Sequence, residues 1–373
     1  MSAAGLIFAG TDKFNVPELT TDRVVSGIPF GGRYRLIDFA LSGMVNAGIS
    51  HVGIITGSNY QSIMDHIGNG KDWDLARRTG GLYFLPPFKT TKLNQGYEQQ
   101  AQTHLSLLID NMPYIEKCAK DVLVVADGYS VCNMDIKKVL AFHEESGSDI
   151  TIVTRNMNAP DNAYISVTTD ENSRVTGLKN CFNEKGECRV NTGVAIYNIP
   201  VLIQLLNTAI SYRMTDLHRE LLAPRLDKLK ISAMNFDGWF ARFSTLEEYF
   251  VSSMQLLLPE VQKEVIANPE RPILTKVRNS PPVYYAPDAH CADSLVADGC
   301  VIDGEVENCI LFRGVHIGHG SKLKNCIIMQ DTYIGENANL CCVVTDKDVL
   351  IGNGTRLCGT SVLPFFVGKG KRV

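Results

Sequence analysis

The last 85 residues carry an internal repeat that leaves few folds open to this part of the chain. The segments IGHGSKL, IGENANL and IGNGTRL begin at Ile317, Ile334 and Ile351, so each copy starts 17 residues after the previous one. Between them, weaker apolar positions recur at steps of five or six residues. This spacing is typical of the hexapeptide repeat, in which three short strands form one triangular coil. We therefore predict a left-handed parallel β-helix of about four coils over residues 289–373.

The first 258 residues show a different pattern, in which short apolar runs alternate with amphipathic segments. The runs AGLIFAG, HVGIITG, DVLVVADG and DITIVTRN have the length of strands, and the segments between them carry apolar residues at helical spacing. The alternation predicts βαβ units and a Rossmann-like α/β domain with a mostly parallel sheet over residues 1–258. Ligands of such sheets bind beyond the carboxyl ends of the strands, which here include Gly10 and Asp127.

The segment between these two parts, residues 259–288, contains six prolines and few positions of regular periodicity. It predicts an extended linker between two domains. The ends of a β-helix leave strand edges unpaired, so we expect the second domain to pack against the first or against another subunit.

Composition narrows the possible functions. The net charge is −4 and no long run of Lys or Arg occurs, which argues against nucleic-acid binding. The 11 cysteines are odd in number and form no CxxC pair, so we expect free thiols in a reducing cytoplasm and no zinc site. The N-terminus lacks the features of a secretory signal, and no run approaches the roughly 20 apolar residues of a membrane span.

One basic residue of the first domain lies in apolar surroundings. In the segment DGWFARFSTLEEY, Trp239 and Phe243 indicate a buried strand, and Thr245 indicates the start of a helix. Arg242 lies within the predicted strand and stays protonated at any relevant pH. A buried cation requires an acidic partner or a bound anion.

Two segments carry a resemblance to a known family. IPFGGRYRLIDFALSGMVNAGI (residues 28–49) and SIMDHIGNGKDWDL (residues 62–75) resemble ADP-glucose pyrophosphorylase, also called glucose-1-phosphate adenylyltransferase. The resemblance implies a nucleotidyltransferase-like domain, a β-helix, a tetramer and a role in bacterial glycogen synthesis. In this reaction glucose 1-phosphate attacks the α-phosphorus of ATP, which requires cations, backbone N–H groups and carboxylates that hold Mg²⁺.

The residues that the resemblance would assign to this chemistry are mostly replaced. The phosphate loop reads AGTDKFNVPELT, which keeps Gly10 but lacks the family's later glycines and its arginine. Val25 stands at the position of a phosphate-binding lysine, and Arg242 at that of a magnesium carboxylate. Asp127 remains as the other carboxylate. The residues that would remain from a nucleotide and sugar-phosphate site are then Gly10, Gly96, Asp127 and Gly193. We expect no intact catalytic residue and no bound metal.

Two interpretations of Arg242 remain open from the sequence. In the first, it pairs with Asp127 or another acid and fills the vacated metal site. In the second, it anchors the phosphate of a bound effector or nucleotide. The first interpretation predicts a protein without the cation shell and the metal that catalysis requires.

The most consistent hypothesis is a noncatalytic regulatory subunit, similar to the GlgD-type subunits found beside a catalytic subunit in some Gram-positive bacteria. The resemblance implies a heterotetramer with a catalytic ADP-glucose pyrophosphorylase subunit, and the chain alone could form homo-oligomers. One alternative is an active adenylyltransferase with a rearranged site. Among the hypotheses, this is the one in which the protein would use Mg²⁺. A second is a ligand-sensing module without turnover, with Arg33 and Arg35 as anion-binding residues. A third is a β-helix acyltransferase that uses His316 or His319.

Overall fold

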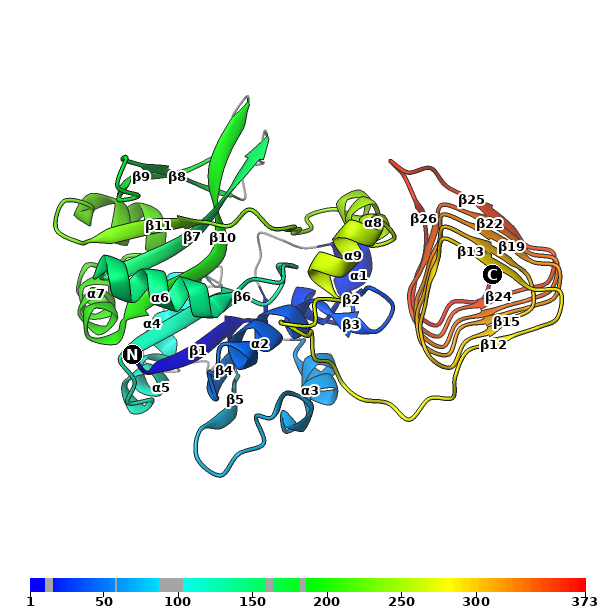
Figure 1. The fold of residues 1–373 in the computed structure, drawn as a ribbon, viewed down its shortest axis with the longest axis horizontal. Coiled ribbons are helices and arrows are strands. Elements are labelled where there is room, and N and C mark those ends of the chain that lie inside the picture. Colours follow the sequence, from blue (N-terminus) through cyan, green and yellow to red (C-terminus); the bar gives the residue numbers. More distant parts are fainter. Residues whose placement is uncertain (11–15, 58, 87–102, 159–163, 182–185) are drawn as a thin grey trace.

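The computed structural model describes all residues except 11–15, 58, 87–102, 159–163 and 182–185. An α/β domain is followed by a β-helix that lies beside it (Figure 1). In the described part of the chain, no helix has the length and apolar character required to cross a membrane.

The N-terminal domain is built on one sheet with the order β11-β7-β10-β6-β1-β4-β5. In addition, β8 pairs with β10, and β9 pairs with β8. Strand β1 pairs in parallel with β4 and β6, and β10 runs antiparallel to β6 and β7, which confirms the predicted mostly parallel sheet. The strands of the sheet are β1 (Ala3–Phe8), β4 (His51–Ile55), β5 (Gly81–Leu85), β6 (Val122–Asp127), β7 (Ile150–Asn158), β8 (Ile165–Thr169), β9 (Val175–Asn180), β10 (Glu187–Asn198) and β11 (Ile231–Asn235), and a separate hairpin is formed by β2 (Pro29–Phe30) and β3 (Tyr34–Arg35).

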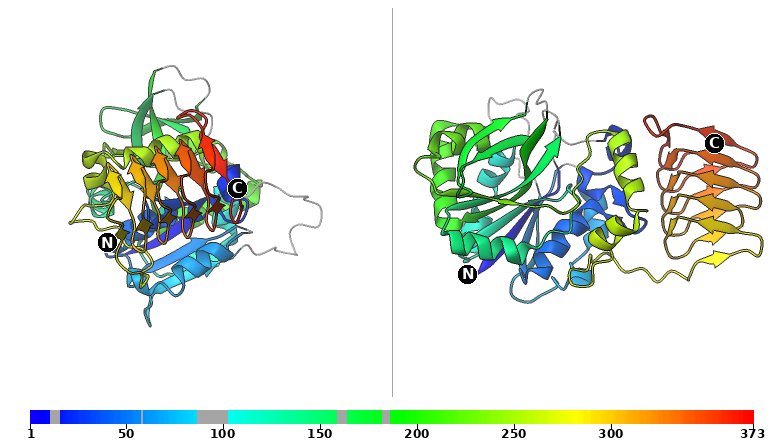
Figure 2. Two further views of the ribbon diagram at one scale, coloured as in Figure 1. Left: turned by 90° about the vertical axis from the view of Figure 1, so that its right-hand side faces the viewer. Right: turned by 45° about the horizontal axis from the view of Figure 1, so that its top comes forward.

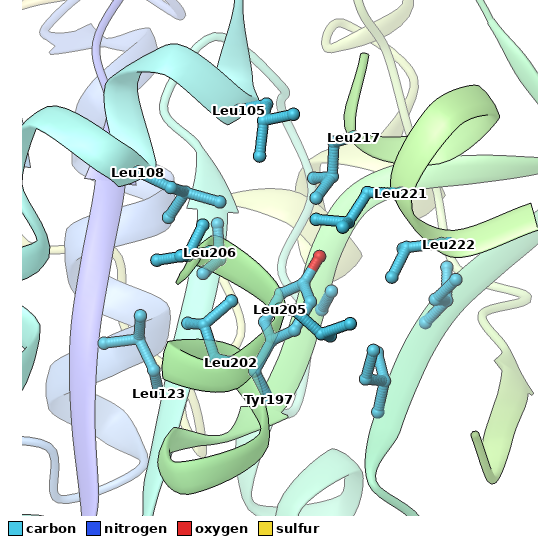
Figure 3. Packing of buried hydrophobic residues seen from close by; sticks show 14 of the residues in the cluster. Leu105, Leu108, Leu123, Tyr197, Leu202, Leu205, Leu206, Leu217, Leu221 and Leu222 are labelled. Atoms are coloured by element: carbon cyan, nitrogen blue, oxygen red, sulfur yellow. The ribbon is translucent and has the colours of Figure 1, made fainter. Parts of the chain in front are cut away.

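Helices cover both faces of this sheet. On one face, α4, α5, α7 and the short helical segment Leu217–Leu222 bury a leucine-rich cluster against β1 and β6 (Figure 3). On the other face, α2 and α6 bury Ile, Leu and Val side chains. Burial of this apolar area is the main favourable term for the domain. The helices are α1 (Pro17–Thr20), α2 (Leu36–Asn46), α3 (Gln61–Ile67), α4 (His104–Asp110), α5 (Met112–Lys117), α6 (Ile136–Ser146), α7 (Ile199–Tyr212), α8 (Leu246–Gln255) and α9 (Pro259–Val265).

The C-terminal domain is a stack of triangular coils, as the 17-residue repeat predicts (Figure 2). Its three parallel sheets have the orders β12-β15-β18-β21-β24, β13-β16-β19-β22-β25 and β14-β17-β20-β23-β26. The strands are β12 (Tyr284–Tyr285), β13 (His290–Ala292), β14 (Leu295–Val296), β15 (Val301–Ile302), β16 (Glu305–Glu307), β17 (Ile310–Leu311), β18 (His316–Ile317), β19 (Lys322–Lys324), β20 (Ile327–Ile328), β21 (Tyr333–Ile334), β22 (Asn339–Cys341), β23 (Val343–Thr345), β24 (Leu350–Ile351), β25 (Arg356–Cys358) and β26 (Phe365–Val367).

An apolar interface joins the two domains. Outward side chains of the β14-β17-β20-β23-β26 sheet, among them Ile310 and Ile327, belong to the same buried cluster as Tyr249 of α8. At the edge of this interface, Arg23 and Asp346 form an ion pair at 2.9 Å whose side chains are 3% and 6% exposed. The β-helix is therefore held against the first domain by both apolar burial and a buried charge pair.

Three details of the sequence prediction are corrected. Residues 259–265 form α9 rather than an extended linker, because Pro259 suits the first turn of a helix and Val261 and Val265 pack into the domain interface. The β-helix begins at Tyr284 and has five strands in each sheet rather than about four coils. The segment around Arg242 is not a strand, since only Ala241 forms an isolated bridge there, although Thr245 does cap α8 as predicted.

Candidate functional site

A buried ion pair occupies the carboxyl end of β6. Asp127 is the last residue of this strand, and Nη2 of Arg242 donates a hydrogen bond to Oδ2 of Asp127 over 2.9 Å. Both side chains are 4% exposed. The prediction that Arg242 pairs with an acid is thus confirmed, and the acid is Asp127, the carboxylate expected to remain from a metal site.

Further contacts hold the guanidinium of Arg242 in place. Its Nε donates to Oγ of Ser130 over 2.9 Å, and its Nη2 donates to the carbonyl of Thr192 over 2.5 Å. Burial works against the charged form, but the neighbouring Asp127 carboxylate, together with Tyr129, Tyr164 and Cys132, raises the pKa of Arg242. Its Cζ atom lies 5.3, 5.5 and 5.6 Å from the ring centroids of Tyr129, Tyr164 and Phe240, respectively.

Gly193 gives the ion pair the space it needs. Its φ is +81°, in the left-handed region, and it lies at an irregularity of β10 between Asn191 and Ala195. A Cβ atom on Gly193 would overlap Oδ2 of Asp127 and lie 2.5 Å from Nη2 of Arg242. The sequence predicted Gly193 as a remnant of a sugar-phosphate site. In this structure its missing side chain accommodates the Arg242–Asp127 pair.

Sequence reasoning missed a third residue at this position, His104. Its ring stacks on Phe8 with centroids 4.2 Å apart, and its Nε2 lies 3.4 Å from Oδ1 of Asp127. The same nitrogen is 3.3 Å from the hydroxyl of Tyr129. Both oxygens of Asp127 therefore face a protein partner. No local pattern in the sequence singles out His104, since α4 and β6 meet only in the folded domain.

The residues at the carboxyl end of β6 do not fit a magnesium ion. Octahedral Mg²⁺ sites use one or more carboxylates together with water and substrate oxygens. Here one carboxylate is engaged by a guanidinium, and a second cation at contact distance would be repelled by Arg242. Within the described residues, no group of three or more His, Cys, Asp or Glu side chains is arranged to hold a metal ion.

The other site residues that the resemblance implied are either not part of the Arg242–Asp127 pair or lie outside the residues that the structure describes. Val25 is 4% exposed in a short helical turn and packs into the apolar cluster at the domain interface. Gly10 follows β1, and a Cβ atom there would meet no atom of the described residues within 4 Å. Gly96 and the loop Thr11–Phe14 lie outside the described residues.

A second cluster of cations lines a narrow pocket between the two domains. Arg33 and Arg35, predicted as anion-binding residues, reach it from the β2–β3 hairpin. The linker and the β-helix supply the others, and no Asp or Glu is among the described residues that line the pocket. The six cations are Arg33, Arg35, Lys276, Arg278, Arg313 and Lys347.

Two of these cations lack full compensation. Arg313 is 5% exposed and pairs through Nε with Asp298 at 3.0 Å, but its Nη2 is buried and has no hydrogen-bond partner in the described part of the chain. Burial, with additional repulsion from Arg35 and Arg23, lowers the pKa of Lys347 to about 7. An anion in the pocket would supply the missing partner for Arg313 and favour the charged form of Lys347.

His316 and His319, either of which an acyltransferase could use, lie in different surroundings. The ring of His316 stacks on Tyr333 with centroids 4.6 Å apart. The side chain of His319 is 65% exposed, and its Nδ1 lies 3.3 Å from Oδ1 of Asp303. His316 is thus half-buried, whereas His319 is at the surface.

Comparisons with known proteins agree with this architecture. Residues 5–240 match the nucleotidyl transferase family, and residues 285–360 match the GlmU-like C-terminal hexapeptide family. The chain is 37% identical over 320 residues to the glycogen biosynthesis protein GlgD of Bacillus subtilis, which covers 86% of this chain and 82% of the relative. It is 31% identical over 325 residues to the glucose-1-phosphate adenylyltransferase of Geobacillus stearothermophilus, with coverage of 86% and 82%. A GlgD protein of the same organism is 36% identical over 318 residues, with coverage of 85% and 81%.

Proposed function

The chain belongs to the family of glucose-1-phosphate adenylyltransferases and GlgD proteins, and on this premise we propose that it is a noncatalytic subunit in glycogen biosynthesis. In this role it assembles in the cytoplasm with a catalytic glucose-1-phosphate adenylyltransferase, as a heterotetramer, and changes the activity or regulation of that partner. The observation that carries the proposal is the buried pair of Arg242 and Asp127.

Several independent losses support the absence of turnover. The guanidinium of Arg242 occupies the space beside Asp127, and Val25 is a core residue without a charge. Adenylyl transfer depends on cations and metal ions that stabilise the charge of the phosphates, and each such term contributes several kcal/mol to the transition state. One neighbouring side chain cannot replace all of these cations and metal ions. Modulation of a partner then operates through the subunit interface, by stabilising one arrangement of the catalytic chain over another.

The isolated chain is expected to release no pyrophosphate from ATP, glucose 1-phosphate and Mg²⁺. Arg242→Asp, which restores a carboxylate, is also expected to remain inactive, since Val25 and the loop at Thr11–Phe14 are unchanged. A coupled pyrophosphate assay checks both proteins, with a catalytic relative such as that of Geobacillus stearothermophilus as the positive control. Turnover by the unmodified chain near the rate of that control would contradict the proposal.

A second candidate function is supported by the inter-domain pocket. Six cations without a carboxylate among the described lining residues, and the unpartnered Nη2 of Arg313, favour an anionic ligand. A ligand bound there would contact both domains at once. The chain would then sense a phosphate-bearing metabolite without converting it, which is compatible with a noncatalytic subunit.

Sulfate, a phosphate analogue whose charge does not change near neutral pH, is expected to bind this pocket more weakly as the pH rises through about 7, because Lys347 loses its proton over that range. Lys347→Met is expected to lower the affinity for sulfate about tenfold, the effect of losing one hydrogen bond to a charged group, and to abolish this pH dependence. Titration calorimetry with sulfate measures both effects. Lys137→Met, at an exposed position of α6, is the matched control. Equal affinities for the two variants at every pH would rule out this pocket as the binding site.

A further inference from the structure

Three thiols lie close together in the last two coils of the β-helix. Cys341 ends β22 and Cys358 ends β25, and the two residues are direct partners in the parallel register of these strands. Cys342 is the next residue in the chain after Cys341, and the Sγ atoms of these two are 4.0 Å apart. All three cysteines are free thiols.

Cys341 and Cys358 face the outside of the coil. The residues before them, Leu340 and Leu357, are paired in the same register and belong to the buried interior of the β-helix. Because side chains alternate between the two faces of a sheet, the two cysteines point the other way. Cys358 is exposed and Cys341 is partly exposed, so small molecules in solution can reach both thiols.

The spacing of the two strands suits a disulfide. Neighbouring strands of a sheet lie about 4.8 Å apart, and the Cα atoms of disulfide-bonded cysteines are usually about 4.4–6.8 Å apart. The two thiols already interact, since burial raises the pKa of Cys341 and a hydrogen bond with the thiol of Cys358 acts in the opposite direction. A bond between the two Sγ atoms therefore requires no large movement of the backbone.

A second pair of thiols in the same domain is not accessible to solvent. Cys309 and Cys326 are 17 residues apart, the same separation as that of Cys341 and Cys358, and their thiols also form a hydrogen bond. Both side chains are 0% exposed, so a dissolved oxidant does not reach them in the folded chain. Exposure, and not spacing alone, therefore distinguishes Cys341 and Cys358 as the pair that can react.

We propose that Cys341 and Cys358 are a modification site, at which a low-molecular-weight disulfide such as oxidised glutathione reversibly forms a disulfide bond between them. The thiolate of Cys358 attacks the small disulfide, which releases one small thiol and leaves a mixed disulfide on Cys358. The thiolate of Cys341 then attacks Sγ of Cys358, and the second small thiol leaves. The two protein thiols are oxidised, the oxidant is reduced to two thiols, and these take up the two protons.

The bond would restrain the base of an exposed loop. Residues 359–364 connect β25 to β26, and Phe365 after them donates its N–H to the carbonyl of Cys342 over 3.0 Å. The loop carries Val362 and Leu363, which are 64% and 78% exposed. Cys342 belongs to the buried cluster between the two domains. Oxidation therefore acts on a loop that starts beside the domain interface.

The site is independent of the proposed noncatalytic role, because it uses neither residue of the Arg242–Asp127 pair. Reversible, redox-sensing disulfides are the usual kind in cytosolic proteins. The inference thus holds whether or not the chain has catalytic activity.

The test equilibrates the full chain with mixtures of reduced and oxidised glutathione, alkylates the remaining thiols and maps the peptides by mass spectrometry. We expect a disulfide between Cys341 and Cys358 that dithiothreitol removes, while Cys309 and Cys326 are alkylated only after unfolding. Cys358→Ser should abolish the disulfide. Cys291→Ser is the matched control, because Cys291 is partly exposed but has Val306 as its partner in the next coil, and it should leave the disulfide unchanged.

Thermal unfolding gives a second readout. The oxidised chain is expected to unfold about 5 °C higher than the reduced chain, because the bond restricts the unfolded state, and Cys358→Ser should show no such difference. The proposal would be overturned if Cys341 and Cys358 stayed fully alkylated even in oxidised glutathione alone. A disulfide between Cys341 and Cys342 instead, or a mixed disulfide on Cys358 that Cys341 never resolves, would overturn it as well.

Discussion

Arg242→Met is expected to lower the free energy of unfolding by about 3–5 kcal/mol, the cost of removing one partner of a buried ion pair. Asp127 would lose its guanidinium partner at 4% exposure, and His104 would lie 3.4 Å from it. Chemical denaturation followed by circular dichroism measures the loss. The matched control is Arg219→Met, because the side chain of Arg219 is 72% exposed and pairs with Glu220 at the surface. This control should cost at most about 1 kcal/mol.

A double variant separates the ion pair from the bulk of the arginine side chain. If the cost of Arg242→Met comes from the unpaired carboxylate, Asp127→Asn in the same chain should recover part of it, because the charge is then absent. A double variant that loses the sum of the two single effects would show that the two side chains are not coupled. The contact at 2.9 Å would then have no energetic role.

Gly193→Ala is expected to destabilise the fold by about 2–6 kcal/mol, combining overpacking with a strained backbone. The new methyl group would overlap Oδ2 of Asp127, and the φ of Gly193 is +81°. Gly10→Ala is the matched control, since its new methyl group would meet no atom of the described residues within 4 Å and should change stability by at most about 0.5 kcal/mol. Thermal and chemical unfolding of the two variants are compared directly. Similar losses for both would contradict the role assigned to Gly193.

The architecture was predictable from the sequence because it follows from local patterns. The repeat of 17 residues determines the β-helix, since each coil repeats the same inward positions. Arg242 in an apolar segment required an acid or a bound anion, so its pairing with Asp127 was one of the two interpretations that the sequence left open. The structure bears out this pairing at 2.9 Å.

Other features depend on contacts between segments far apart in the chain. Gly193 looks like a binding residue in the sequence, and its steric role emerges only when β10 and β6 are neighbours in the sheet. His104 meets Asp127 through the packing of α4 on the sheet. Arg33 and Arg35 were predicted as cations near an anion site, but Arg313 and Lys347 join them only because the β-helix packs against the first domain. The six prolines of residues 259–288 led to the prediction of a linker, although Pro259 begins a helix.

The most direct test of a noncatalytic, modulating subunit is a titration of this chain into the catalytic glucose-1-phosphate adenylyltransferase of the same organism. The quantity measured is the rate at which the catalytic enzyme releases pyrophosphate. The mass of the complex is determined in parallel by light scattering. We expect a mixed complex and a rate that changes until the complex is saturated, and a folded Arg242→Asp variant should give the same saturating rate as the unmodified chain. A catalytic chain that forms no mixed complex and keeps the same rate at every ratio would contradict this role.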